Sequence, residues 1–256
     1  YHGASPLYAS VVSLVLPIVV SQLLYSGGTF TGSSSGLSGF ESFDVSLQAW
    51  FWIAGVFLVF VTAGAWMFVR SDAGRVLAIE NHQDFDSAEL VGFCEGTRGV
   101  GITFDTGNSF PVLEAPMDFT ARVAPHVRHL HLKDYRVQFT TEGYRLVRCA
   151  IGDGAVPFAQ LVPALLTHRP DLNAVLEPGA LEARHVRFLN PGWWQGYAPK
   201  SGEEVARCLA AAQVNRLPED ADFRTPWEKG EDQRLEAYEL DMIRRSAANV
   251  RALGLN

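Results

Sequence analysis

The first 69 residues contain no lysine or arginine, and this constrains the fold more than any other feature of the sequence. Their only acidic residues are Glu41 and Asp44. Two apolar runs in this part, residues 6–25 and 47–69, are each long enough as helices to cross the hydrocarbon of a bilayer. We therefore predict an apolar segment, residues 1–75, with two transmembrane helices, followed by a polar domain over residues 76–256.

The first basic residues, Arg70 and Arg75, follow the second apolar run, and the intervening loop has none. The positive-inside rule then places the polar domain in the cytoplasm, tied to the inner or plasma membrane. A secretory signal peptide fits less well because no basic residues precede the first run. A buried core hairpin is the remaining alternative for these runs.

The polar domain alternates short runs of Val, Ile and Leu with helical segments, which is typical of βαβ units and an α/β fold. Asp86 and Glu89, like Ser201 and Glu204, have the spacing of a capping box and predict the starts of two helices. We expect strands at residues 76–79, 101–104, 127–130 and 173–176, and helices at 86–95, 116–123, 156–167, 201–213 and 232–253.

Each predicted strand is followed at once by a side chain that can bind a hard cation. These four residues are Glu80, Asp105, His131 and Glu177, spaced by 25, 26 and 46 residues. In a parallel barrel the carboxyl ends of the strands open on one face, so the four side chains are expected to converge. Three carboxylates and one imidazole suit Mn²⁺, Mg²⁺ or Co²⁺ better than a structural zinc.

Four motifs carry a resemblance to a known family: Ile79-Glu-Asn-His82, Phe104-Asp-Thr-Gly-Asn108, His129-Leu-His-Leu-Lys-Asp134 and Leu176-Glu-Pro-Gly179. In this order they resemble the xylose isomerase-like TIM barrels, which include sugar and sugar-phosphate isomerases and epimerases. The resemblance covers residues 76–256 and implies a half barrel made of the four C-terminal βα units. It also implies a metal held by the four strand-end residues.

A divalent metal that bridges a carbonyl and the adjacent hydroxyl acidifies the C–H between them by stabilising an enediolate. By the resemblance, Glu80 and Glu177 are the catalytic pair that removes and returns the proton. His82, Asn108 and Arg136 are candidate substrate-binding residues on the following loops. Asp134 is expected to orient His131 from behind.

The net charge of −7 argues against a nucleic-acid partner, so the DNA-repair members of the same superfamily are a poor match. The predicted partner is a small sugar or sugar phosphate. The three cysteines lack metal-type spacing and are predicted to be reduced. Half a barrel exposes a sheet edge and its inner side chains, which favours association into a homo-oligomer.

Residues 1–77 resemble something different. The stretch Thr31-Gly-Ser-Ser-Ser-Gly-Leu-Ser-Gly-Phe40, the second apolar run and Arg70-Ser-Asp-Ala-Gly-Arg75 are similar to the permeases of branched-chain amino acid or urea ABC importers. This predicts a fusion near Val76. The alternatives to an isomerase are therefore a membrane transport component and an inactive chimera that lacks half of the barrel.

Overall fold

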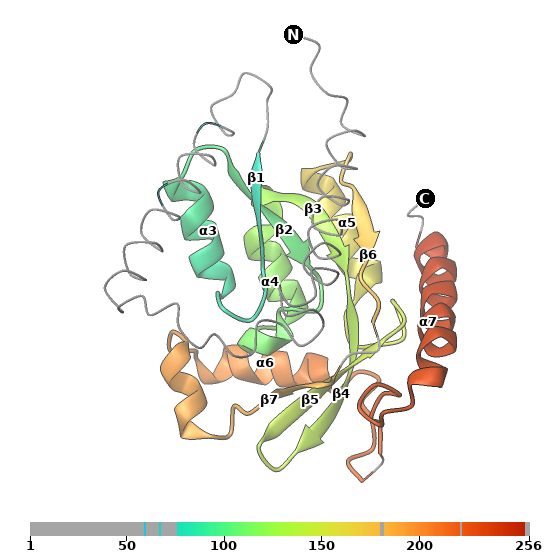
Figure 1. Ribbon diagram of the computed structural model, residues 1–256. Helices are drawn as coiled ribbons and strands as arrows, with labels where there is room; N and C mark the ends of the chain where they lie inside the picture. The colour runs from blue at the N-terminus through green and yellow to red at the C-terminus, as the bar shows by residue number, and fades with distance from the viewer. Residues whose placement is uncertain (1–58, 60–66, 68–75, 180–181, 221, 254–256) are drawn as a thin grey trace, which may run out of the picture. The chain divides into compact units, whose positions relative to one another are not determined.

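A four-stranded parallel sheet forms the centre of the described chain (Figure 1). The computed structural model describes residues 59, 67, 76–179, 182–220 and 222–253. Of these, the residues from Gly64 onward belong to one compact unit. The strands lie in the order β1, β2, β3, β6, with bounds Leu77–Glu80, Val100–Asp105, Val127–Leu132 and Ala174–Leu176.

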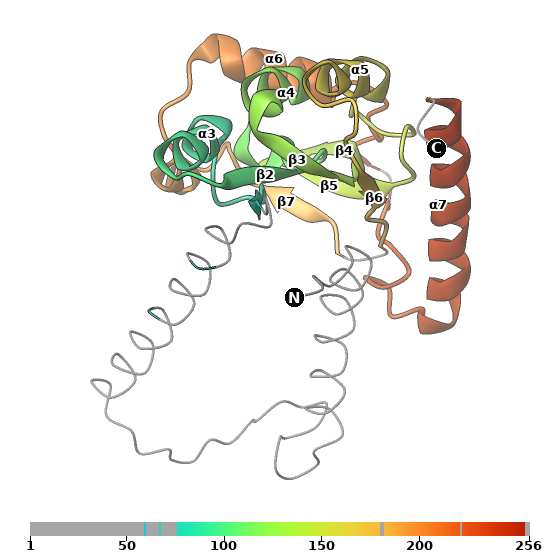
Figure 2. The same ribbon diagram turned by 90° about the horizontal axis from the view of Figure 1, so that it is seen from above.

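Helices cover one face of this sheet (Figure 2). Their side of the sheet carries alternate residues of each strand, including the fully buried Ile102, Phe104 and Leu130, as expected for side chains that alternate between faces. The opposite face carries the polar side chains of the strand ends. The covering helices are α3 (Ser87–Gly96), α4 (Pro116–Val123) and α5 (Phe158–His168), and α6 (Gly202–Ala212) lies beside α4, where Arg207 pairs with Asp118.

Both predicted capping boxes are confirmed. The Asp86 carboxylate accepts hydrogen bonds from the backbone N–H groups of Ala88 and Glu89, and the Glu89 side chain accepts from the backbone of Asp86. Ser201 and Glu204 form the same reciprocal pair at the start of α6. Each box satisfies N–H groups that the first helical turn leaves without a partner, which fixes where the helix begins.

An antiparallel sheet that the sequence analysis did not predict lies beside the parallel one. Its strands, in the order β4, β5, β7, span Asp134–Thr140, Gly143–Cys149 and Arg184–Val186. β4 and β5 form a hairpin inserted between β3 and α5. This insertion accounts for the longer spacing between His131 and Glu177.

The last helix, α7 (Asp232–Ala252), docks on the loop that follows β5. The backbone N–H of Ile151 donates to the Ser246 hydroxyl at 3.0 Å, and the Asn249 amide donates to the carbonyl of Ile151 at 2.7 Å. Short 3₁₀ helices complete the described elements, at Phe110–Val112, Ala124–His126 and Pro191–Gly196.

The parallel sheet with its helices confirms the α/β prediction and is consistent with part of a TIM barrel. Apart from Val59 and Met67, the two apolar runs at residues 6–25 and 47–69 lie outside the described residues. Within the described part, no helix is both long and apolar enough to cross a membrane. The membrane segment, the domain boundary at residue 75 and the fusion therefore stay predictions.

Asp134 ties the loop after β5 to the start of β4. Its buried carboxylate accepts hydrogen bonds from the backbone N–H groups of Tyr135, Gly152, Gly154 and Val156, at 2.9 to 3.1 Å. A side chain at Gly154 would collide with this carboxylate and come within 2.5 Å of the carbonyl oxygen of Tyr135. The loop can therefore pass so close to Asp134 only because residue 154 is a glycine.

We expect Gly154→Ala to lower the free energy of unfolding by about 2 kcal/mol or more, because the added methyl group separates Asp134 from its donors. Gly92→Ala is the matched control, since nothing lies within 4 Å of a methyl group at that position in α3. It should stabilise the protein by up to about 1 kcal/mol through helix propensity. Urea unfolding of both variants measures the difference, and equal stabilities would contradict the collision.

Candidate metal centre

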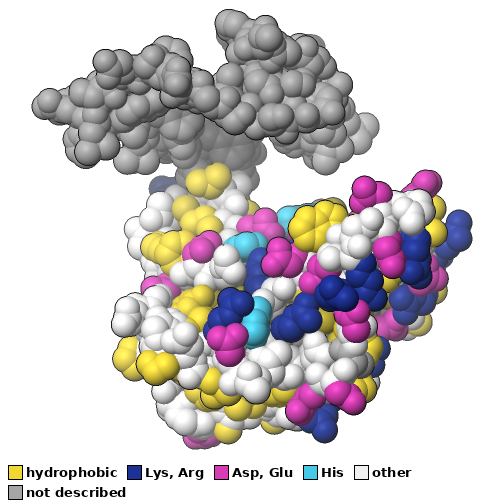
Figure 3. All heavy atoms as spheres, turned by 60° about the horizontal axis from the view of Figure 1, so that its bottom comes forward, with side chains coloured by type: hydrophobic (Ala, Val, Ile, Leu, Met, Phe, Trp, Pro, Cys, Tyr) yellow, Lys and Arg dark blue, Asp and Glu magenta, His cyan; other side chains and the backbone are white. Residues whose placement is uncertain are grey.

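Three of the four predicted ligands lie together at the carboxyl ends of their strands. Ligand atoms of Glu80, His131 and Glu177 all lie within 4.8 Å of one another. The Nδ1 atom of His131 is 3.0 Å from Glu80 Oε1 and 3.4 Å from Glu177 Oε2. Figure 3, which brings the lower end of Figure 1 forward, shows histidine, acidic and basic side chains side by side on this face.

The arrangement of these atoms fits a divalent cation. In a six-coordinate site with bonds of about 2.1 Å, neighbouring ligand atoms lie about 3 Å apart, close to the two distances measured here. Glu177 Oε2 is buried and has no hydrogen-bond partner among the described residues. A buried carboxylate oxygen without a donor is costly, and a bound cation would satisfy it.

The fourth predicted ligand, Asp105, is placed differently. Its side chain is fully buried and forms an ion pair with Lys133. The same Nζ atom of Lys133 also lies 2.9 Å from Glu177 Oε1. Asn108 also donates to Asp105 at 2.5 Å. Lys133 thus occupies the space between Asp105 and the three clustered ligands. Sequence reasoning missed this lysine, although it is two residues beyond His131 and so on the same face of the chain.

Burial controls the charge of this pair. Loss of water raises the pKa of Asp105 from 3.8 to about 6, although the neighbouring Lys133 charge opposes the rise. For Lys133, burial alone would lower the pKa, but the charge of Asp105, together with Tyr135 and the hydrogen bonds to Asp105 and Glu177, outweighs burial and the pKa is raised. The lysine therefore stays protonated and neutralises part of the carboxylate charge of the site.

Two side chains, those of Asn81 and Thr106, join the ends of neighbouring parallel strands. The Asn81 amide accepts from the backbone N–H of Asp105 at 2.7 Å and donates to its carbonyl at 3.0 Å, which joins β1 to β2. The Thr106 hydroxyl donates to the carbonyl of Lys133 at 2.7 Å and accepts from its N–H at 3.0 Å, which joins β2 to β3. These bonds fix the register of the strand ends, in which Asp105 lies opposite His131 and Glu80 lies opposite Thr103.

The remaining predicted residues divide into two groups. His82 and Asn108 lie beside the centre and both contact Arg184, at 3.1 and 3.5 Å. Arg136 does not, because its guanidinium donates to the carbonyl of Asn215 and lines a separate pocket. Asp134 was expected to orient His131, but its carboxylate is occupied by the backbone of the loop after β5.

Comparison with known proteins supports the family predicted from the motifs. Residues 69–190 match the family described as xylose isomerase-like TIM barrel. YihM, an uncharacterized protein of Escherichia coli K12, is 33% identical over 99 residues, which are 38% of this chain and 29% of that protein. The chain thus spans less than a third of the length of this relative.

Two solved structures also resemble the chain, each at 20% sequence identity. One is a xylose isomerase-like TIM barrel protein from Mycobacterium smegmatis in complex with magnesium, with a TM-score of 0.36 over 55% of this chain and 44% of that one. The other is a xylose isomerase domain protein from Planctomyces limnophilus, with a TM-score of 0.33 over 40% and 38%. None of these proteins supports the permease resemblance of residues 1–77.

We expect Lys133→Met to destabilise the protein in a pH-dependent way. Because the folded pKa of Asp105 is raised from 3.8 to about 6, wild-type stability falls as the pH rises from about 4, and the fall ends about one unit above pH 6, where the carboxyl is fully ionised. Without Lys133 that pKa rises further, so the loss extends to higher pH and reaches about 3 kcal/mol at pH 8.

Urea unfolding between pH 4.5 and 8 measures this effect. The double variant Lys133→Met/Asp105→Asn removes both buried charges and should recover most of the lost stability. A Lys133→Met curve parallel to that of the wild type would contradict the buried pair.

Proposed function

We propose that this chain is a divalent-metal-dependent isomerase or epimerase of sugars or sugar phosphates. The observation that carries the proposal is the convergence of Glu80, His131 and Glu177 around a carboxylate oxygen that has no donor. The match of residues 69–190 to the xylose isomerase-like TIM barrel family supports the same reaction class.

Glu80, His131 and Glu177 would hold the cation, with Mn²⁺, Mg²⁺ or Co²⁺ as the candidates for a site of carboxylate and imidazole ligands. When bound, it would polarise a carbonyl and the adjacent hydroxyl of the sugar and so acidify the C–H between them. Asp105 can join as a fourth ligand only if its carboxylate exchanges Lys133 for the cation. The three-residue set is therefore the one proposed for the resting site.

Glu80 and Glu177 are the proposed acid and base. Their side chains are 41% and 34% exposed, so both can reach a substrate, whereas Asp105 is enclosed. When one carboxylate takes a proton from a carbon and the other delivers a proton to the opposite face of that carbon, the sugar is epimerised, and delivery to the neighbouring carbon isomerises it. Lys133, 2.9 Å from Glu177, would hold that carboxylate in place.

We expect Mn²⁺ to raise the melting temperature of the purified protein by about 5 °C at saturating concentration. His131→Ala and Glu177→Gln should abolish the shift, because each removes a ligand. Glu182→Gln is the matched control, since this exposed acid lies nearby in the chain but outside the three-residue set. Asp105→Asn should keep the shift if three ligands suffice. An equal shift in Glu177→Gln would refute the site.

The proton-transfer step has its own test. Incubation of the Mn²⁺-loaded protein with a panel of sugars and sugar phosphates in D₂O should introduce deuterium next to the carbonyl of the substrate, which NMR detects even without net conversion. Glu80→Gln and Glu177→Gln should each slow this exchange by about 100-fold or more, because each removes a group that carries the proton. Exchange at the wild-type rate in both variants would exclude them as the acid and base.

A further inference from the structure

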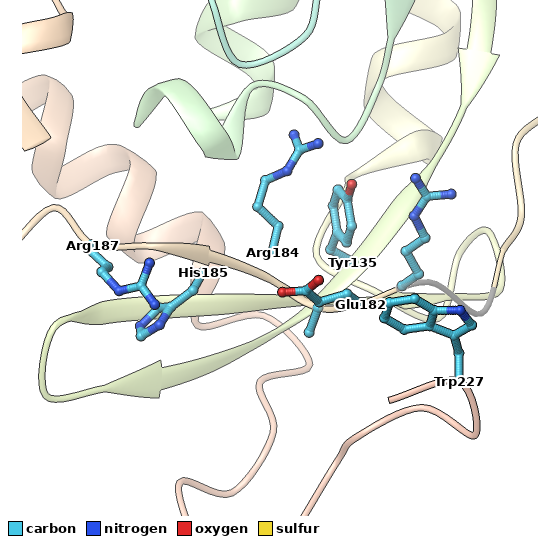
Figure 4. A pocket seen from close by; sticks show the side chains of 8 residues that line it. Tyr135, Glu182, Arg184, His185, Arg187 and Trp227 are labelled. Carbon is cyan, nitrogen blue, oxygen red and sulfur yellow. The ribbon is translucent and has the colours of Figure 1, made fainter. Parts of the chain in front are cut away.

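A pocket beside the metal centre has a strongly basic lining. It has a volume of about 440 Å³ and is lined by Tyr135 of β4, Arg148 of β5, residues 182–185, Arg187 and Trp227. Figure 4 shows Arg184 of β7 and the ring of Tyr135 of β4, the two outer strands of the antiparallel sheet, with Trp227 toward one end and His185 with Arg187 toward the other. The antiparallel sheet thus supplies four of the eight lining residues.

The guanidinium of Arg184 has no carboxylate partner within 4.0 Å among the described residues. Its contacts are the neutral Asn108 and the ring of His82. Neither the amide nor the imidazole carries negative charge, so neither contact compensates the charge of the arginine. By contrast, Arg187 on the same pocket is 3.2 Å from Glu142. A half-buried arginine without an anion is a site prepared to receive one.

The positive charge of Arg148 would be less well compensated by Glu177 once a cation is bound at the metal centre. Its side chain is only 14% exposed, and its Nη2 atom lies 3.9 Å from Glu177 Oε1. Glu177 is shared with Lys133 and His131, and a bound cation would draw on the same carboxylate. Positive charge would then exceed negative charge along this wall, because Glu182 is the one acidic side chain among the lining residues.

Two arginines of the pocket lie close to acidic residues at the ends of the parallel strands. Arg148 contacts Glu177 directly, and Arg184 reaches Asp105 through Asn108. A molecule with one end at Glu80 and Glu177 can therefore place its other end between the two arginines. Trp227, which is 48% exposed, offers an apolar surface of the kind that packs against the C–H face of a sugar.

We propose that Arg184 and Arg148 bind an anionic group, a phosphate or a carboxylate, at the far end of the substrate. The inference rests on the proposed function and narrows it, since neutral sugars become poor substrates. Both anions present oxygens in the geometry that an arginine fork binds with two hydrogen bonds. The uncompensated charge also attracts anions into the pocket before contact.

The test titrates D-fructose 6-phosphate, D-glucuronate and D-fructose into the full chain by calorimetry, with Mn²⁺ and again with EDTA. We expect at least one anionic sugar to bind about tenfold more tightly than D-fructose. Arg184→Gln should remove most of this advantage, and Arg184→Lys, which keeps the charge but not the fork, should retain part of it. Which of the two anions binds distinguishes phosphate from carboxylate.

Arg187→Gln is the matched control, because this arginine lines the same pocket but already pairs with Glu142. It should change affinity by less than about twofold. Equal affinity for all three sugars, or an equal loss in Arg187→Gln and Arg184→Gln, would overturn the anion site. Anion binding that depends on Arg184 in EDTA, together with no response to Mn²⁺, would instead refute the metal-dependent function and leave the anion site standing.

Discussion

The candidate site depends on hydrogen bonds that fix the register of the ends of neighbouring parallel strands. Parallel pairing fixes the direction of the strands, but the last residue of each strand lies where the regular ladder stops. Asn81 and Thr106 extend the ladder by one step, since each pairs with both backbone groups of the next strand. Because both side chains are fully buried, water does not compete with these bonds.

The same alignment creates an electrostatic problem that Lys133 solves. Three carboxylates brought to one end of a sheet repel one another, and Asp105 is fully enclosed. A buried lysine between Asp105 and Glu177 compensates this repulsion without any bound ion. The acids fall into two groups. Asp105 is enclosed and pairs with the lysine, whereas Glu80 and Glu177 face His131 and remain partly exposed.

The sequence predicted the features that follow from a strict chain pattern. The four strands, the helices between them and the polar residue after each strand all follow from periodicity, and both capping boxes follow from local spacing. Lys133 was missed because its burial depends on the distant Asp105, which no local pattern reports. Asp134 was assigned to His131 because of proximity in sequence, but the chain turns there into β4 and carries the carboxylate toward a different loop. The hairpin was missed although Tyr135, Val137 and Phe139 alternate with polar residues, which is the pattern of a half-buried strand.

This missed hairpin separates two tasks that a complete barrel assigns to loops on a single sheet. The residues suited to proton transfer and metal binding, Glu80, His131 and Glu177, follow strands of the parallel sheet. The two arginines of the neighbouring pocket, Arg148 and Arg184, belong to β5 and β7 of the antiparallel sheet. Since side chains on paired strands are held more rigidly than those on loops, an anion bound there would be positioned accurately relative to the metal centre. Changes in β5 or β7 could then alter which substrate binds while the strand ends that carry the chemistry stay in register.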